Sequence, residues 1–218
     1  MAVIDVSELR DPTRDPNKVK KVKYPNMKML CEFDPNIVPE DSVRIAGIRD
    51  YSLCDGPGIR RVVYFQGCYH KCKGCHNPET WATDGGTIIP ISDIFKDLPP
   101  MTTGITFSGG EPAYQLDALV KAMEMAKFIG LDVCVYTGAI LSEWRLLTYL
   151  NPDMLSLYDY VKIGPYIEEL RDLSLAYRGS SNQKLYKNDG GELNEVIPEW
   201  GLVYRKVDTR KCPTSKTN

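Results

Sequence analysis

The sequence predicts a single α/β domain whose strands lie mainly parallel in one sheet. Short apolar runs of strand type alternate along the chain with amphipathic helical segments, and this alternation is typical of parallel βαβ units. Glycine-containing loops follow several expected strands, where α/β proteins usually place functional residues. The 218 residues and a hydrophobic content of 43% are sufficient for a domain with a substantial core.

The first part of this domain is expected to hold two strands around a turn-rich loop. Residues 43–48 and 61–65 have the alternating or β-branched pattern of strands, and residues 52–60 between them are rich in glycine and proline. A short helix is expected over residues 91–98, because Ser92 is a suitable N-cap and two prolines follow the segment.

The clearest helix is expected over residues 115–129, where apolar side chains recur on one face and Gly130 provides the usual end. Strands at 104–107 and 131–136 flank it, and a second helix is expected over 141–150. Further strands are expected at residues 160–163, 184–186 and 201–204.

The two ends of the chain differ from the compact part at residues 43–204. Residues 1–42 contain repeated prolines and lysines with little periodicity, so they are interpreted as an extended or partly disordered extension. Residues 205–218 are interpreted as a polar C-terminal tail.

Composition limits the partners and the compartment. The net charge of −2 gives no reason to expect a nucleic-acid or membrane partner, and no run approaches the roughly 20 apolar residues of a membrane span. The N-terminus has no basic region followed by an apolar stretch, as a secretory signal would. Seven cysteines, an odd number, argue against a disulfide framework. A cytoplasmic protein is therefore expected.

The densest chemical motif is a cysteine-rich loop after the second expected strand. Cys68, Cys72 and Cys75 have the spacing C-x3-C-x2-C, and both histidines, His70 and His76, lie in the same stretch. Thiolates are soft ligands suited to iron–sulfur clusters or zinc. Because a 4Fe-4S cluster usually takes four cysteines, three close thiolates would leave one iron open to another ligand.

Zinc is the alternative occupant of this loop. Three cysteines with His70 or His76 would make an ordinary structural zinc site. Such sites more often have two C-x2-C-like halves, and no second half exists here. The remaining cysteines stand alone in the sequence: Cys31, Cys54, Cys134 and Cys212.

A second motif, SGGEP at residues 108–112, lies between an expected strand and helix. The glycines Gly109 and Gly110 would let backbone amides approach a ligand where a Cβ would collide. The carboxylate of Glu111 would accept hydrogen bonds from an ammonium group. Alone, such a loop is more often a tight turn, so its significance depends on the neighbouring cysteines.

Weaker candidates lie at other strand ends and in the first loop. Tyr136, Thr137 and Lys162 end two expected parallel strands and would face a shared site, although a lysine there is often only solvated. Asp55 and Gly56 belong to a glycine- and proline-rich loop that is expected to be rigid, and whose simplest interpretation is a structural turn.

Taken together, these motifs resemble the radical S-adenosylmethionine (SAM) enzymes, for which C-x3-C-x2-C is a signature. Within that superfamily the chain is similar to the activating enzymes of the anaerobic (class III) ribonucleotide reductase over about residues 43–204. The resemblance rests on Gly74 and on four runs. These are DGPGIR at 55–60, CHNPETW at 75–81, SGGEP at 108–112 and RGSSNQ at 178–183.

The resemblance implies the architecture and the cofactors. The fold would be an incomplete (β/α)6-type radical SAM barrel, with a parallel sheet open on one side. Cys68, Cys72 and Cys75 would bind three irons of a 4Fe-4S cluster, and the fourth iron would bind SAM. The chemistry would be reductive cleavage of SAM, followed by abstraction of a hydrogen from a glycine of the partner.

The resemblance also implies further roles for individual residues. Gly109, Gly110 and Glu111 would meet the SAM amine, and Gly74, Cys75 and His76 would lie near its adenine. Tyr136, Thr137 and Lys162 are candidates for the SAM ribose or carboxylate. Lys162 departs from the family, in which an acidic residue is commoner, so its contacts are in doubt. Asp55 and Gly56 are expected to help receive the target polypeptide.

The expected partners are the catalytic subunit of the anaerobic ribonucleotide reductase and a flavodoxin-like electron donor. Three alternatives stay open at this point. The chain would instead activate another glycyl-radical enzyme such as pyruvate formate-lyase, act as a radical SAM enzyme on a small molecule, or serve as a non-catalytic zinc-binding module.

Overall fold

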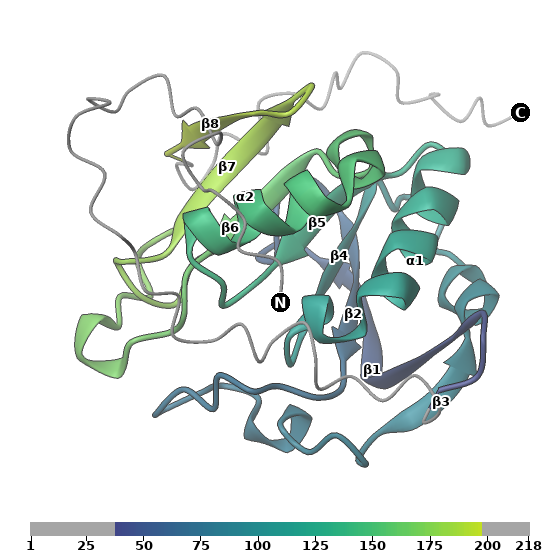
Figure 1. Cartoon of the computed structure of the whole chain (residues 1–218), viewed down its shortest axis with the longest axis horizontal. Helices are drawn as coiled ribbons and strands as arrows, with labels where there is room; N and C mark the ends of the chain where they lie inside the picture. The colour runs from purple at the N-terminus through teal and green to yellow at the C-terminus, as the bar shows by residue number, and fades with distance from the viewer. Residues whose placement is uncertain (1–37, 198–218) are drawn as a thin grey trace, which may run out of the picture. The chain divides into compact units, whose positions relative to one another are not determined.

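The computed structural model describes residues 38–197, which contain one eight-stranded sheet with the strand order β3-β1-β2-β4-β5-β6-β7-β8 (Figure 1). The strands are β1 (Ser42–Ser52), β2 (Arg60–Phe65), β3 (Thr87–Pro90), β4 (Gly104–Gly109), β5 (Asp132–Tyr136), β6 (Tyr160–Ile163), β7 (Lys184–Asp189) and β8 (Glu192–Val196). The two α-helices are α1 (Leu116–Phe128) and α2 (Leu141–Leu150). Short 3-10 helices are η4 (Pro78–Thr80), η5 (Ile91–Phe95), η6 (Pro112–Gln115), η7 (Pro152–Ser156) and η8 (Glu168–Leu170).

The sheet is parallel only at its centre. Strands β2, β4, β5 and β6 pair in parallel, whereas β1, β3, β7 and β8 are attached by antiparallel pairing. The prediction of a parallel sheet is therefore corrected to a mixed sheet with a parallel centre. The reason lies in the connections, because parallel neighbours need a long crossover and the short loop between β1 and β2 cannot provide one. The sheet ends in β3 and β8 and does not close into a barrel.

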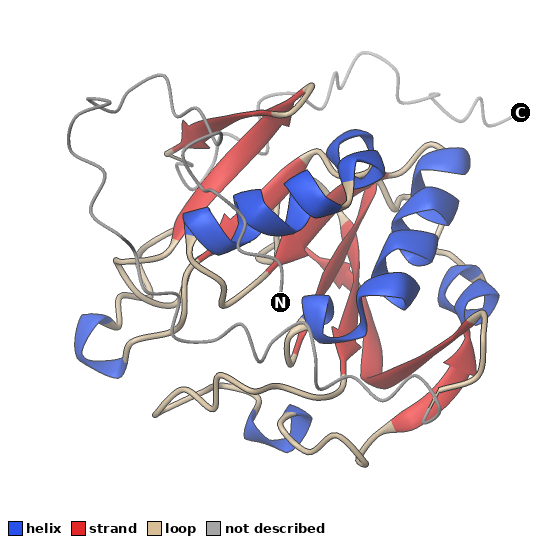
Figure 2. Cartoon of the chain, viewed as in Figure 1, coloured by secondary structure: helices blue, strands red, loops and turns tan. Residues whose placement is uncertain are grey.

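Both α-helices cover the same face of the sheet (Figure 2). On that face the alternate residues of the four central strands form the core with Leu119 and Met123 of α1 and with Trp144 and Leu147 of α2. The strand residues that face the helices are Val63, Phe65, Ile105, Phe107, Val133, Val135, Val161 and Ile163. The intervening strand residues point to the opposite face, which therefore remains available for a site.

The opposite face, here called the inner face, carries a smaller cluster and several polar groups. Cys134 and Tyr136 of β5 pack there with Leu185 of β7 and with Ala176 and Tyr177. These last two residues belong to the long connection between β6 and β7.

Most predicted elements are confirmed, with shifted ends. Helix α2 and strand β6 match their predicted ranges, and α1 is one residue shorter at each end. The segment predicted as a helix at 91–98 is the shorter 3-10 helix η5. Strand β1 continues well past the predicted residue 48.

Strand β8 was missed because its sequence, ELNEV, is polar and half-exposed. The sequence feature that could have predicted this strand is the preceding pair Gly190 and Gly191. Both have positive φ and join β7 and β8 in a tight hairpin. The predicted strand at 201–204 and the proposed end segments lie wholly or largely outside the described residues. Within residues 38–197, the structure contains no helix long and apolar enough to cross a membrane.

Candidate functional site

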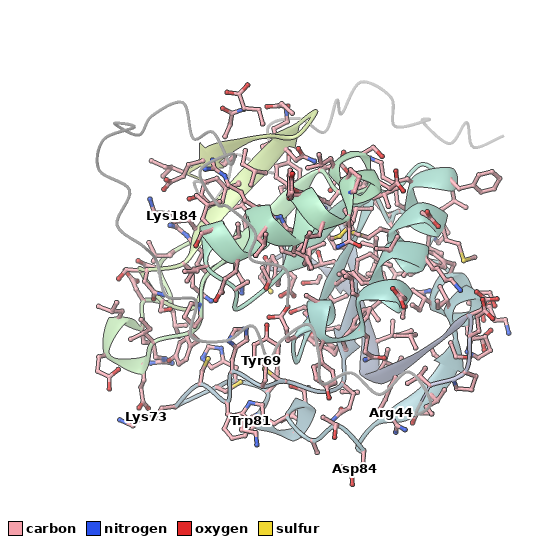
Figure 3. The ribbon with its side chains drawn as sticks, viewed as in Figure 1. Arg44, Tyr69, Lys73, Trp81, Asp84 and Lys184 are labelled. Carbon is pink, nitrogen blue, oxygen red and sulfur yellow. The ribbon has the colours of Figure 1, made fainter. Side chains whose placement is uncertain are left out.

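The three clustered cysteines lie on a loop that follows β2 and runs from Gly67 to Trp81, here called the cluster loop. Two backbone hydrogen bonds close its base, from Gly67 N to Thr80 O at 2.8 Å and from Cys68 N to Trp81 O at 3.2 Å. The buried Gln66 amide donates to two further carbonyls near the returning end of the loop. The loop is therefore a closed unit at the carboxyl end of a parallel strand, and Tyr69, Lys73 and Trp81 mark it in Figure 3.

Cys68, Cys72 and Cys75 are half-buried free thiols. The backbone folds back between the last two, with Cys75 N donating to Cys72 O at 3.1 Å, and Asn77 N donates to Cys75 Sγ at 3.4 Å. Burial raises the pKa of Cys68 to about 11 and also raises the pKa of Cys72. A bound cationic centre would reverse this preference, because metal binding displaces thiol protons.

The donor set fits an iron–sulfur cluster, since it offers several soft thiols on one loop. Within residues 38–197 no group of three or more His, Cys, Asp or Glu side chains is already arranged to hold a metal ion. The other described cysteines lie outside the loop: Cys54 is exposed and Cys134 is buried on β5. Cys31 and Cys212 lie outside the described residues.

The paired glycines of the SGGEP motif let two backbone segments pass at close range. A Cβ on Gly109, whose φ is +98°, would lie 2.5 Å from Phe65 N, and one on Gly110 would lie 2.3 Å from Gly67 O. The motif is fastened to the same segments by hydrogen bonds from Gly110 N to Phe65 O and from Glu111 N to Gly67 O. The glycines therefore allow the end of β4 to lie directly against the start of the cluster loop. This packing requirement for glycine was not evident from the sequence.

Glu111 is fully buried and its carboxylate contacts three separate segments. It accepts from Ala113 N at 3.1 Å, from Thr137 Oγ1 at 2.9 and 3.0 Å, and from Gly138 N at 2.9 Å. His70 Nε2, from the cluster loop, lies 3.0 Å from the Glu111 Oε2 atom. The structure thus joins the cluster loop, the SGGEP motif and the end of β5 at one carboxylate.

Lys162 and Tyr136 meet on the inner face at the ends of β6 and β5. The Lys162 Nζ atom lies 4.0 Å from the centroid of the Tyr136 ring, a cation–π contact. Burial lowers the pKa of Lys162 to about 8, and the nearby Asp55 and Cys134 oppose that shift. Among the described residues Lys162 has no ion pair.

The Tyr136 hydroxyl is the second unsatisfied group at this place. It is buried and has no hydrogen-bond partner within residues 38–197, and burial raises the pKa of Tyr136 well above its usual value. A protonated phenol and an unpaired ammonium therefore face the same region, which is what a ligand with an anionic group and further polar atoms would need.

The loop that contains Asp55 and Gly56 is held from beneath by Arg60, a fully buried side chain of β2. The guanidinium donates to Pro57 O and to Thr106 Oγ1, both at 2.6 Å, and pairs with Asp132 at 2.7 Å. Thr106 Oγ1 in turn donates to Asp55 O at 2.5 Å. The loop is therefore anchored through a buried arginine beneath it, a contact that the composition of the loop did not reveal.

The half-buried Asp55 side chain lies at the edge of this loop and accepts hydrogen bonds from Ser52 Oγ at 2.5 Å and from Cys54 Sγ at 3.7 Å. Gly56 has φ +118°, and a Cβ there would lie 3.0 Å from the Arg60 Cδ atom. Exposed Tyr51 and Leu53 adjoin the loop. Asp55 and its neighbours thus form a partly open edge beside the inner face.

The far end of the cluster loop contacts the connection between β6 and β7, which the sequence did not identify as part of the site. Gly74 has φ +70°, and its missing Cβ would lie 2.8 Å from Glu168 Oε1. Lys73 pairs with Glu168 at 3.0 Å, and the ring of His76 lies 5.1 Å from the ring of Tyr166. Gly74 and His76 are therefore placed away from the Glu111 junction, at the other end of the loop.

The RGSSNQ run at 178–183 organises this connection. Gln183 Oε1 accepts from Gly179 N at 2.9 Å, while Gln183 Nε2 donates to Gly164 O at 3.0 Å. Asn182 Nδ2 donates to Pro165 O at 2.8 Å. The run therefore fixes the chain after β6 in position next to the cluster loop.

The comparisons with known proteins agree with this site. The 4Fe-4S single cluster domain family matches residues 54–186, which is more than half of the chain. The anaerobic ribonucleoside-triphosphate reductase-activating protein of Escherichia coli K12 is 32% identical over 147 residues, covering 62% of this chain and 92% of that protein. The protein of the same name from Enterobacteria phage T4 is 32% identical over 151 residues, with 63% and 92% covered.

A second group of relatives is similar over a shorter stretch. The pyruvate formate-lyase-activating enzyme of Clostridium pasteurianum is 39% identical over 102 residues, covering 44% of this chain and 43% of that enzyme, so this chain spans less than half of its length. The chain therefore belongs to the 4Fe-4S single cluster domain family and to the family of the anaerobic ribonucleoside-triphosphate reductase-activating proteins, of which it covers 92%.

Proposed function

We propose that this protein is a radical SAM activase that generates a glycyl radical on an anaerobic ribonucleoside-triphosphate reductase. The observation that carries the proposal is the junction at Glu111, which brings a three-thiol loop next to a Gly-Gly turn and the ends of β5 and β6. The choice of target is supported by the similarity to proteins named as activators of that reductase, which covers 92% of their length and about 62% of this chain.

The architecture proposed for this activity is an incomplete (β/α)6-type radical SAM barrel. Its support is the parallel centre formed by β2, β4, β5 and β6, with both α-helices on one face. The cluster loop, the SGGEP motif and the candidate residues of β5 and β6 lie at the carboxyl ends of these strands, as in other α/β enzymes, whereas the loop with Asp55 precedes β2. Residues 43–204 would form this catalytic domain, residues 1–42 an extension and residues 205–218 a tail.

Cys68, Cys72 and Cys75 would hold three irons of a 4Fe-4S cluster, and SAM would bind the fourth. When bound, these two cofactors would supply the reductive cleavage of SAM and the abstraction of a hydrogen atom from the target glycine. The protein contributes the position of the cluster loop, fixed at its base and at the Glu111 junction. It also contributes a buried surface that would keep water from the reacting groups.

The chain's own groups suggest how SAM would be oriented. The Gly109 and Gly110 backbone would face the methionyl amine, and Gly74, Cys75 and His76 would face the adenine. Tyr136 and Lys162 would receive the ribose and carboxylate, since the Tyr136 hydroxyl has no hydrogen-bond partner among the described residues and the Lys162 ammonium lies over the Tyr136 ring. Thr137 already donates its hydroxyl to Glu111 and its N–H to the Lys162 carbonyl, so it would act by holding this corner together.

Lys162 provides a pH-dependent test of this orientation. Its ammonium form predominates below a pKa of about 8, and the neutral amine above that value would lose its attraction for the SAM carboxylate. The dissociation constant for SAM should therefore rise about tenfold between pH 7.5 and pH 9. Equilibrium dialysis of reconstituted protein with labelled SAM measures this effect.

Two variants separate Lys162 from other titrating groups. Lys162→Arg should remove the pH dependence in this range, because a guanidinium stays charged. Lys162→Met should bind SAM weakly at every pH. A wild-type dissociation constant that does not change across this range would contradict the assignment.

Asp55 is proposed to help receive the target polypeptide at the partly open edge of the inner face. Asp55→Ala should lower glycyl-radical formation on the reductase about tenfold or more while changing SAM cleavage less than twofold, because truncating an important interface side chain costs more than about 1 kcal/mol of binding free energy. The two rates are measured by electron paramagnetic resonance and by chromatography of 5′-deoxyadenosine. Asp117→Ala, at an exposed site on α1, is the control. Equal loss of both activities would reject this role.

The remaining partners and the compartment follow from the same proposal. A flavodoxin-like protein would supply the electron, and the catalytic subunit of the reductase would be the macromolecular substrate. The net charge of −2 supports protein partners over nucleic acid or membrane surfaces, and the odd number of cysteines supports the cytoplasm.

The second candidate function is activation of another glycyl-radical enzyme such as pyruvate formate-lyase. A specific observation favours it, namely that the pyruvate formate-lyase-activating enzyme of Streptococcus mutans is 45% identical over 99 residues. That similarity covers only 38% of the S. mutans enzyme, whereas the reductase activators are covered almost completely. The zinc-module alternative is disfavoured by the match to a 4Fe-4S domain.

The deciding experiment is anaerobic electron paramagnetic resonance on reconstituted protein with SAM, a reductant and either the anaerobic reductase or pyruvate formate-lyase. A glycyl doublet that appears only with the reductase, and only when all components are present, is the expected result. A doublet with pyruvate formate-lyase alone would transfer the assignment to the second candidate. Absence of both the doublet and 5′-deoxyadenosine would reject the radical SAM proposal.

A further inference from the structure

We propose that Glu111, His70 and Gly138 form a latch that fixes the cluster loop in its ligating position. In this assignment Glu111 is a positioning residue and leaves the SAM amine to other groups of the site. The inference rests on the proposed function for its catalytic meaning, but the latch itself is a property of the chain without cofactors.

The Glu111 carboxylate has no acceptor position left for an ammonium group. An ionised carboxylate offers about four lone-pair sites. Ala113 N, Thr137 Oγ1 and Gly138 N supply three protein donors, and the Nε2–H tautomer of His70 supplies the fourth. Because the side chain is fully buried, a further donor would have to displace one of these groups. Its contacts therefore serve to connect segments of the protein.

His70 is the residue through which this connection reaches the thiols. It lies midway between Cys68 and Cys72, its side chain is only 16% exposed, and its ring packs on that of Tyr69 at 4.3 Å. The hydroxyl of Tyr69 is buried without a partner among residues 38–197, so it does not anchor this part of the loop. The hydrogen bond of His70 to Glu111 is therefore the side-chain anchor between the first two ligand positions.

Gly138 provides the space in which the His70 ring lies. A Cβ at this position would be 2.5 Å from His70 Cδ2 and 2.6 Å from His70 Nε2, both far inside contact distance. The backbone of Gly138 does not have the left-handed φ that would itself require glycine. Gly138→Ala would therefore leave the other three donors to Glu111 (Ala113 N, Thr137 Oγ1 and the backbone N of residue 138) in place and act chiefly by pushing the imidazole away.

These relations define a matched set of variants. Gly138→Ala and His70→Ala should both open the latch, one by steric displacement and the other by removal. His70→Gln should restore part of it, because the amide can donate to the carboxylate. Gly47→Ala is the matched control, since a Cβ there has nothing within 4 Å and the backbone φ is ordinary. Glu111→Gln tests the carboxylate itself.

The first measurement is the alkylation rate of individual thiols in the anaerobic apoprotein, followed by mass spectrometry with iodoacetamide as the probe. Gly138→Ala and His70→Ala should raise the rates at Cys68 and Cys72 about tenfold, His70→Gln should raise them less than threefold, and Gly47→Ala should leave them unchanged. The exposed Cys54 is the internal reference within each sample. Urea unfolding of every variant separates a local opening from general loss of stability.

The second measurement is SAM binding by the reconstituted variants that keep the fold. If Glu111 only positions the loop, Gly138→Ala and His70→Ala should lose iron and SAM binding to about the same extent as Glu111→Gln does. If only Glu111→Gln loses SAM binding, while Gly138→Ala and His70→Ala keep wild-type iron content and thiol protection, the latch is rejected. If Gly138→Ala and His70→Ala show increased thiol reactivity but the wild-type protein cleaves no SAM, the latch is retained and the proposed activity is rejected.

Discussion

Serine substitution of Cys68, Cys72 or Cys75 is expected to abolish both cluster retention and 5′-deoxyadenosine formation. Losing a group that merely supports a metal ligand costs about 10–100-fold in metal affinity or activity, so loss of a ligand itself should exceed 100-fold. The three thiols are carried by one loop, and the soft donor set cannot be completed by serine oxygen. Iron and labile sulfide per chain, with chromatography of the nucleoside product, measure the effect.

The control for this series is Cys54→Ser. Cys54 is an exposed free thiol outside the cluster loop, so its removal should leave the iron content and the SAM cleavage rate within twofold of the wild type. Full iron content in any one of the three loop variants would reject that cysteine as a ligand. Loss of iron in Cys54→Ser would show that the ligand set extends beyond the loop.

Arg60→Met is expected to lower the free energy of unfolding by about 3–5 kcal/mol, because removing one partner leaves buried polar groups and a paired charge uncompensated. Arg60 is fully buried, pairs with Asp132, and also donates to Thr106 Oγ1 and to the carbonyls of Pro57 and Ile105. Urea unfolding of the anaerobic apoprotein, monitored by circular dichroism, gives the free energy.

A surface ion pair provides the comparison for Arg60. Lys187 pairs with Asp189 at 2.5 Å, but both side chains are about half exposed and screened by water, so Lys187→Met should change the free energy of unfolding far less than Arg60→Met does. Arg60→Lys should retain only part of the stability, because an ammonium cannot reproduce the guanidinium fork. Similar small effects for Arg60→Met and Lys187→Met would show that the buried network contributes little.

The Arg60 network also connects stability with the proposed docking edge. Since Arg60 and Thr106 hold the backbone of Pro57 and Asp55, a folded Arg60 variant should impair radical transfer in the same direction as Asp55→Ala. The glycine- and proline-rich composition predicted a rigid loop, but it did not reveal the guanidinium that anchors the loop from below.

The positions of the cysteine loop and the SGGEP motif at strand ends were predictable because each motif lies within a short segment of the sequence. The spacing of Cys68, Cys72 and Cys75 within one loop indicates a shared ligand, and no distant contact is needed to see it. Helix α2 and strand β6 were predicted at their observed ends for the same reason, since periodicity and terminal residues act within a few positions. The alternation of elements was also sufficient to predict an α/β fold.

The tertiary structure alone decided what several predicted residues touch. Glu111 meets His70 across 41 positions and Thr137 across 26, and Gly109 and Gly110 are required by the nearby backbone of Phe65 and Gly67. Such contacts depend on strand order and register, which one sequence does not specify residue by residue. The sequence by itself thus determined the grouping of three cysteines on one loop and the alternation of elements. Packing between distant segments decided the antiparallel edges, the Lys162–Tyr136 contact and the His70–Glu111 contact.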